Sequence, residues 1–142
     1  MLVGDGPLAA GLEVPARDAG VSMLGERDDV PELMRNADLF VFPSLPEGEG
    51  MPGVLIEAGL SGLPVVATDV PGVRTVVDDT VTGHVVATGD LAGLCDLVDQ
   101  LLSDPGRLHE MGAAARSRCQ AEFTMDVSAR RWRDLLDEIG RR

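Results

Sequence analysis

The chain has 142 residues, a length at which one domain can bury a core, and 44% of them are hydrophobic, which excludes an intrinsically disordered protein. Its formal net charge is −12, with twelve arginines and no lysine, and this excludes a protein that binds nucleic acid by neutralising phosphates. No apolar run approaches the roughly 18 residues of a membrane span, and the N-terminus lacks a signal-peptide pattern. Because the two cysteines, Cys95 and Cys119, have no metal-binding spacing and form no disulfide framework, we expect a cytoplasmic protein.

The first part of the chain predicts, in order, a strand over 2–4, a helix over about 8–19, a strand over 21–25 and a short helix over 29–37. Pro15 is expected to interrupt or bend the first of these helices. Asp28 or Asp29 is expected to cap the second, with Pro31 in its first turn.

The middle of the chain predicts, in order, a strand over 38–44, a helix over 52–61, a strand over 64–69, one or two helical turns over 72–79 and a strand over 82–88. The strand sequences are continuously apolar, which is typical of a parallel sheet buried on both faces. This alternation predicts an α/β fold with a doubly wound, Rossmann-like parallel sheet.

From Asp90 onward the pattern is wholly helical. Three helices are expected, the second beginning at Pro105 and the third capped by Thr124 or Asp126. The first of the three carries an apolar stripe at helical spacing, made of Leu91, Leu94, Leu97, Val98 and Leu101.

The segment EGMPGVLIEAGLSGLPVVATDVPG, residues 49–72, places Glu49 in a loop and Glu57 in the helix that follows. In open α/β sheets ligands bind beyond the carboxyl ends of the strands, where this loop is expected to lie. Pro52 has no N–H to lose at the helix start, and the amides of Gly53, Val54 and Leu55 can point at an anion. The segment therefore predicts a site for a group such as a pyrophosphate.

Two glutamates beside a pyrophosphate cannot bind it directly, because like charges repel. They can accept hydrogen bonds from hydroxyl groups on either side of it. A nucleotide sugar has this layout, with ribose hydroxyls, a diphosphate and sugar hydroxyls in succession. We therefore expect Glu49 and Glu57 to bind the two sugars of a nucleoside-diphosphate sugar.

The sequence SLPEGEGMPGVLIEAGLSGLPVVATDVPGVRTVV resembles the Glu-x7-Glu segment of retaining glycosyltransferases with the GT-B fold, the large family 4 or glycosyl transferases group 1. The flanking blocks are similar as well: LVGDGPL, LGERDDVPELMRNADLFVFPS, DDTVTGHVV and LLSDPGRLHEMGAAARSR. The resemblance covers nearly the whole chain. It implies one half of a GT-B fold, a single donor-binding domain over residues 1–142.

The resemblance implies a role for each matching position. Glu57 would hold the ribose hydroxyls, and Glu49 would lie beside the transferred sugar as the catalytic glutamate. The other implied donor-binding residues are Gly50 and Met51 at the sugar, Gly53, Val54 and Leu55 at the diphosphate, and Gly25, Glu26, Arg27 and Leu33 at the base. No metal or other cofactor is expected, since GT-B enzymes do not rely on one.

The chain departs from the family pattern in two ways. The sequence SLPEGEGMP offers Glu47-Gly48 as well as Glu49-Gly50, so the loop is two residues longer than is common. The N-terminal acceptor domain of such enzymes, and the basic pair that clamps the diphosphate, have no counterpart here. We therefore expect the donor half of an enzyme that transfers a sugar to an acceptor hydroxyl with retention, and no transfer by this half alone.

Other interpretations of the same residues remain open. The two glutamates could be solvated side chains, and Glu47 with Glu49 could form a metal-binding carboxylate pair. The basic residues around Trp132 could anchor the last helix at a membrane surface, although packing of that helix on protein is simpler.

Two alternative functions follow from these readings. One is a non-catalytic nucleotide-sugar-binding module, or a truncated remnant that pairs with a separate acceptor-binding domain. The other is a fragment of an NAD-binding oxidoreductase, because Gly4, Gly6 and Ala9 match G-x-G-x-x-A and Glu26 lies about 20 residues on. Against it, Pro7 removes an N–H where a pyrophosphate needs donors.

Overall fold

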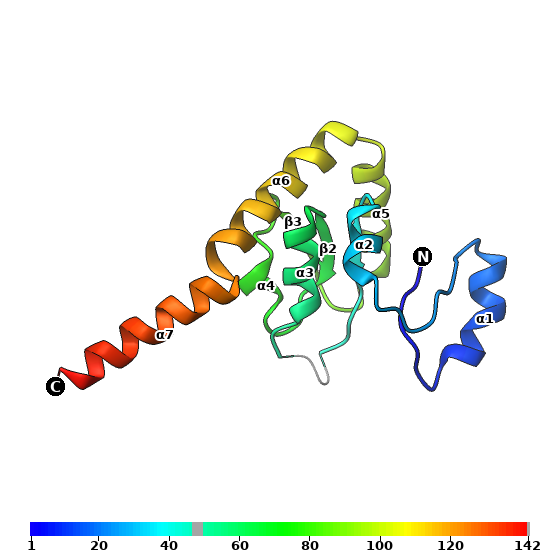
Figure 1. Cartoon of the computed structure of the whole chain (residues 1–142). Helices are drawn as coiled ribbons and strands as arrows, with labels where there is room; N and C mark the ends of the chain where they lie inside the picture. Colours follow the sequence, from blue (N-terminus) through cyan, green and yellow to red (C-terminus); the bar gives the residue numbers. More distant parts are fainter. Residues whose placement is uncertain (47–49, 142) are drawn as a thin grey trace. The chain divides into compact units, whose positions relative to one another are not determined.

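The structure, a computed structural model, describes residues 1–46 and 50–141. The backbone divides into two units, Met1–Leu33 and Met34–Arg142. The helices are α1 (Ala9–Asp18), α2 (Val30–Arg35), α3 (Gly53–Ser61), α4 (Val73–Val76), α5 (Leu91–Leu102), α6 (Pro105–Glu122) and α7 (Met125–Gly140) (Figure 1). The strands are β1 (Phe40–Phe42), β2 (Val65–Thr68) and β3 (Gly83–Val86).

In the first unit, the two predicted strands pair in parallel through a single bridge between Leu2 and Met23. The Leu2 N–H donates to the Ser22 carbonyl at 2.8 Å, and the Leu24 N–H donates to the Leu2 carbonyl at 2.9 Å. Helix α1 lies between these two segments in the chain and is not interrupted at Pro15, which lies inside it. None of its residues is buried.

The second unit is built on a parallel sheet in the order β1-β2-β3. Phe40 pairs with Val65, which in turn pairs with Gly83. Every residue of β2 is buried, as its continuous apolar sequence predicts for a central strand. The predicted parallel sheet is therefore confirmed, with strands shorter than expected.

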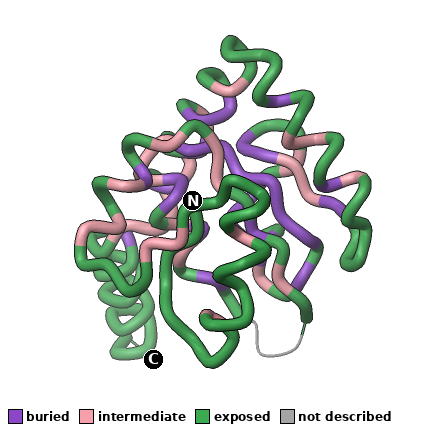
Figure 2. Tube along the Cα trace, turned by 90° about the vertical axis from the view of Figure 1, so that its right-hand side faces the viewer, coloured by how far each residue is buried: buried purple, intermediate pink, exposed green. Residues whose placement is uncertain are grey.

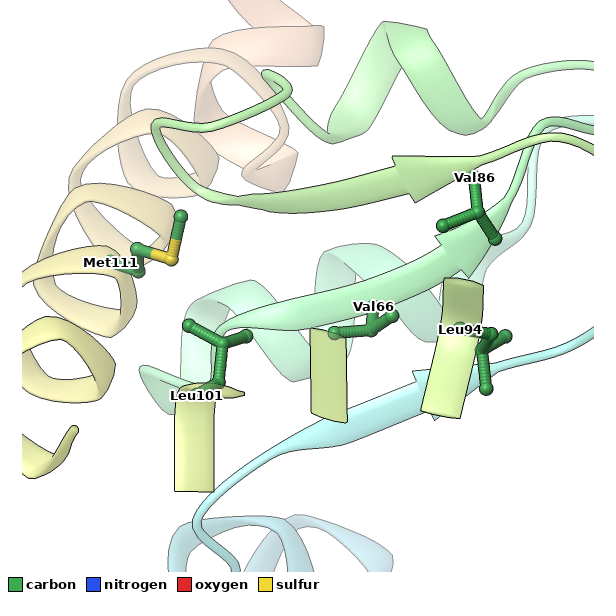
Figure 3. Packing of buried hydrophobic residues seen from close by; sticks show 5 residues of the cluster. All are labelled: Val66, Val86, Leu94, Leu101 and Met111. Carbon is green, nitrogen blue, oxygen red and sulfur yellow. The ribbon is translucent and has the colours of Figure 1, made fainter. Parts of the chain in front are cut away.

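Helices cover both faces of this sheet. The crossovers through α3 and α4 advance in the same direction across the sheet, so their right-handedness places both helices on one face. They contact each other, and α3 contacts β2. Helix α5 packs on the other face against β2 and β3, where Val66 and Val86 meet Leu94, Leu101 and Met111 (Figure 3). Figure 2 shows buried residues along the inner segments of the trace, whereas the helix that ends at the C-terminus is almost wholly exposed.

The apolar stripe of α5 is confirmed except at its first residue. Leu94 and Leu101 are buried, and Leu97 and Val98 pack against the same cluster. Leu91 is 69% exposed, because it occupies the first position of the helix, beyond the packed layer.

Side-chain caps begin the three C-terminal helices. Asp90 accepts from the Gly93 N–H at 2.9 Å, and Asp104 accepts from the Arg107 N–H at 3.0 Å. Thr124, and not Asp126, caps α7 by accepting from the Val127 N–H at 3.4 Å. Both residues were candidates from the sequence, and only Thr124 has the extended backbone that an N-cap requires.

Glycines let α6 approach the segments around it closely. A Cβ at Gly112 would overlap the Gly62 carbonyl oxygen, and one at Gly59 of α3 would overlap the Cys119 sulfur. Helix α7 differs, since Val127 is its only buried residue and Trp132 is 65% exposed. Over the described part of the chain, no helix is both long and apolar enough to cross a membrane.

Candidate donor-binding site

The candidate site lies where β1 and β2 end. Both strands are parallel, so the connections that leave their carboxyl ends, β1 to α3 and β2 to α4, start from the same edge of the sheet. Thr68, the last residue of β2 and 5% exposed, donates its hydroxyl to the Ser44 carbonyl at 2.5 Å. The Phe42 carbonyl lies 3.3 Å from the same hydroxyl. The end of β2 is therefore tied to the start of the β1–α3 connection.

A second contact joins the same two connections further along. Gly72 has a left-handed backbone, with φ of +82°, and is the N-cap of α4. A Cβ at this position would overlap the Gly50 carbonyl oxygen and lie 2.7 Å from the Met51 Cα. Only a glycine fits here, both because of the backbone conformation and because of the close approach. Gly72 therefore packs directly against the residues that lead into α3.

Helix α3 begins at this edge with its N-terminal amides. Pro52 is the N-cap, has extended backbone, and supplies no side-chain cap. The Leu55 N–H already donates to the Pro52 carbonyl at 3.1 Å, and the Leu55 side chain is fully buried. Of the three amides predicted to face an anion, those of Gly53 and Val54 therefore precede the first bond of the helix.

Gly53 and Glu57 lie four residues apart and so share one face of α3. Both are exposed, whereas Leu55, Ala58 and Gly59 form the buried side. The Cα–Cβ bonds in a helix tilt toward its N-terminus, so that of Glu57 points back toward the turn that holds Gly53. Gly50 and Met51, which precede the helix, are exposed as well.

Glu49, the predicted catalytic residue, lies outside the described residues, as do Glu47 and Gly48. Sequence reasoning gave no role to Thr68 or Gly72, although both stand in the segment that carried the prediction. The signal for Gly72 was the Pro-Gly pair before a helix, and Thr68 was one polar residue at the end of an apolar strand. Neither signal identifies the residue that Thr68 or Gly72 contacts, because that residue comes from another part of the chain.

An ion pair lies on the β2–α4 connection. Arg74 donates from Nε to both carboxylate oxygens of Asp69, at 2.9 and 3.0 Å. Thr88, after β3, donates its hydroxyl to the Asp69 carbonyl at 3.1 Å. The β2–α4 connection is thus held by one contact from α4 and one from the residues that follow β3.

The residues predicted to receive the base belong to the first unit. Gly25 is exposed and has φ of +65°, Glu26 is exposed, and Leu33 is half-buried in α2. Arg27 forms a two-pronged ion pair with Asp29, at 2.8 and 2.5 Å. This hydrogen bonding raises the pKa of Arg27 and lowers the pKa of Asp29.

In the turn that matches a dinucleotide fingerprint, backbone N–H groups donate to acceptors of the same turn. The Gly6 N–H donates to the Asp5 carboxylate at 2.8 Å, and the Ala9 N–H donates to the Gly6 carbonyl at 2.9 Å. These amides are therefore occupied within the turn. In residues 1–46 and 50–141, no group of three or more His, Cys, Asp or Glu residues is placed to hold a metal ion.

Comparison with curated proteins gives relatives over nearly the whole chain. It is 32% identical to N-acetyl-alpha-D-glucosaminyl L-malate synthase of Bacillus anthracis, over 98% of this chain and 37% of that protein. It is 33% identical to a GDP-mannose-dependent phosphatidylinositol monomannoside mannosyltransferase of Corynebacterium glutamicum, over 96% of this chain and 38% of that protein. The chain thus spans well under half the length of these relatives.

Comparison with solved structures also gives matches over nearly the whole of this chain and under half of the other. Anabaena HepE in complex with UDP matches with a TM-score of 0.86 at 25% identity, over 96% of this chain and 40% of that one. Sucrose-phosphate synthase from Thermosynechococcus elongatus matches with a TM-score of 0.82 at 27% identity, over 97% and 37%. The predicted fold class, one half of a GT-B glycosyltransferase, is confirmed. A family model described as "Glycosyl transferases group 1" matches residues 1–104, and the chain belongs to this family.

Proposed function

We propose that residues 1–142 act as the donor-binding domain of a retaining glycosyltransferase and bind a nucleoside-diphosphate sugar at the carboxyl edge of the sheet. The observation that carries this proposal is the exposed face of α3, which holds both Gly53 at the helix start and Glu57 four residues on. The relatives support it, because HepE has been solved with UDP and with UDP-glucose.

In this proposal each group of the donor meets a different part of α3 and the residues before it. The amides of Gly53 and Val54, with the positive end of the helix dipole, bind the diphosphate. Glu57 accepts hydrogen bonds from the ribose hydroxyls. Glu49 lies beside the transferred sugar, with Gly50 and Met51 contacting it through the backbone.

The first unit has a separate part in the proposal. The resemblance alone assigns the base to Gly25, Glu26, Arg27 and Leu33. Because the Arg27 guanidinium is already paired with Asp29, it would contact a base with its planar face or its alkyl stem.

The proposed reaction breaks the bond between the anomeric carbon and the diphosphate oxygen. A new bond to an acceptor hydroxyl forms on the same face of the sugar, and the acceptor proton is released. The leaving diphosphate gains negative charge, and the N-terminus of α3 stabilises that charge more in the transition state than in the bound donor. The acceptor would bind to a separate domain, since the relatives are more than twice as long as this chain.

The proposal is tested by thermal shift with UDP, GDP, ADP and NAD on the wild-type chain, Glu57→Ala and Glu13→Ala. Glu13 is an exposed helical glutamate of α1 and serves as the matched control. A ligand at 100 times its Kd stabilises the folded state by about 2.7 kcal/mol. We expect UDP or GDP to stabilise the wild-type and Glu13→Ala chains and to have little effect on Glu57→Ala.

Other outcomes would point elsewhere. Stabilisation by NAD alone would favour a dinucleotide-binding fragment. No stabilisation by any nucleotide would mean that the chain has no working donor site, as expected of a remnant.

A further inference from the structure

We propose that Thr68 is a positioning residue, which together with Gly72 holds the β1–α3 connection at two points and so sets where the N-terminus of α3 lies. Neither residue is assigned a contact with the donor. The proposal concerns the same site as the proposed function and rests on it for its consequence in binding.

The first point is the hydroxyl of Thr68. It has one hydrogen, which the Ser44 carbonyl accepts at 2.5 Å, while the Phe42 carbonyl lies at 3.3 Å. Thr68 itself is fixed by the sheet, because it pairs with Val86 and the next amide, of Asp69, donates to the Val86 carbonyl at 2.7 Å. The central strand therefore holds the start of the connection to α3.

The second point is Gly72, which packs against Gly50 and Met51. Its own position is set by α4, and Arg118 of α6 fixes α4 in turn. The Arg118 guanidinium donates to the Thr75 carbonyl at 3.0 Å and to the Val76 carbonyl at 3.1 Å. A chain of contacts thus runs from α6 through α4 to the residues that enter α3.

The two points matter because the amides of Gly53 and Val54 can bind a diphosphate well only if they are held in place beforehand. A displacement of about 1 Å at such donors is enough to weaken binding strongly. No side-chain cap restrains the start of α3, since Pro52 caps the helix without a side-chain bond. The restraint comes from Thr68 at the end of β2 and from Gly72 before α4, both of which lie in the segment PVVATDVPG.

The test compares Thr68→Val, which keeps the shape but removes the hydroxyl, with Thr68→Ser, which keeps the hydroxyl. Thr82→Val is the matched control. Thr82 is 4% exposed, and its hydroxyl accepts from the Asp78 N–H at 2.8 Å and lies 3.3 Å from the Asp78 carbonyl. It stands just before β3, at the opposite edge of the sheet.

Two quantities are measured: hydrogen exchange of the Leu55 amide, whose bond to the Pro52 carbonyl closes the first turn of α3, in the ligand-free protein, and the Kd for UDP or GDP. We expect Thr68→Val to accelerate this exchange and raise the Kd, each by about tenfold or more relative to Thr82→Val of similar thermal stability. Thr68→Ser should restore both. Equal exchange in the two valine variants, or no rescue by serine, would overturn the proposal.

A second pair of variants tests Gly72 without relying on Thr68. Gly72→Ala and Gly89→Ala introduce the same strain, because their φ values are +82° and +86°. A Cβ at Gly89 meets nothing within 4 Å, whereas one at Gly72 overlaps Gly50. Only Gly72→Ala should accelerate exchange of the Leu55 amide, and equal effects of the two variants would contradict a positioning contact.

Failure of the proposed function gives a different pattern. If no nucleotide binds the wild-type chain, the donor-binding function is wrong, and exchange in the ligand-free protein still decides whether Thr68 and Gly72 hold the start of α3. If a nucleotide binds all variants equally, the function stands and the positioning role is wrong.

Discussion

Gly59 of α3 faces the sulfur of Cys119 of α6 so closely that a Cβ at position 59 would overlap it. Two further atoms, the Cβ of Cys119 and the carbonyl oxygen of Ala115, would each lie 3.4 Å away. Both residues are buried, so the sulfur has little room to move. The closeness of α3 and α6 therefore depends on the missing side chain.

The first prediction concerns this contact. Gly59→Ala should destabilise the chain by about 1–3 kcal/mol through overpacking, although alanine is favoured over glycine in a helix by roughly 1 kcal/mol. Gly11→Ala in α1, where a Cβ meets nothing within 4 Å, should stabilise instead. Urea denaturation measures both. The double variant Gly59→Ala with Cys119→Ala should be more stable than the sum of the single effects, and simple additivity would refute the contact.

A second prediction concerns the pH dependence of stability. Burial raises the pKa of the Cys119 thiol above its ordinary value of about 8.5. Above that pH the unfolded chain loses the thiol proton while the folded chain keeps it, so the free energy of unfolding should fall as pH rises from about 8.5 toward the folded pKa. Cys119→Ala should remove this part of the slope. An unchanged slope in that variant would show that Cys119 does not contribute.

The two thiols should also react differently. Cys95 is exposed on α5 and should react with a maleimide in the folded protein. Cys119 is buried and should react only when the chain unfolds. Mass spectrometry of the labelled chain should show one adduct in buffer and two in denaturant. Two adducts in buffer would mean that the contact between α3 and α6 opens readily.

Arg118 should contribute to stability through geometry and not through charge alone. Its guanidinium donates to two carbonyls of α4 and lies 3.2 Å from Glu122. Lysine cannot donate in the same planar fork, so Arg118→Lys should cost about 1–3 kcal/mol. The exposed Arg116, on the same helix, is the control, and Arg116→Lys should change stability by less than about 0.5 kcal/mol. Equal losses would argue against a role for the fork.

Trp132 is the one tryptophan of the chain and is 65% exposed on α7. Its fluorescence should therefore resemble that of tryptophan in water and be quenched readily by acrylamide. Leu136 and Ile139, also exposed, lie four and seven residues on, so they share its face of the helix. A blue-shifted emission that depends on protein concentration would show that this face is covered by another copy.

The strands and helices were largely predictable because each depends on local pattern. The apolar runs 38–44, 64–69 and 82–88 became β1, β2 and β3, and the Pro52–Gly53 start of α3 followed from the chemistry of proline at a helix N-terminus. Leu91 was misplaced because helical spacing alone does not tell where the packed layer ends.

The contacts that shape the candidate site were not predictable in this way. Thr68 meets Ser44, and Gly72 meets Gly50, across more than twenty residues of sequence. Such partners depend on how strands pair and helices pack, which a single sequence does not display. The role of Glu57 came from the family resemblance and stays a prediction, and so does that of Glu49.

Ser44 contacts Thr68 and Gly50 contacts Gly72, so the number of residues between Ser44 and Gly50 does not determine where α3 lies. Residues can be added or removed in that interval while both ends stay attached to β2 and α4, and loop entropy changes by only about 0.6 kcal/mol for each doubling of length. The extra Glu-Gly of this chain falls in this interval. With both ends held in this way, the interval can change in length without displacing the start of α3.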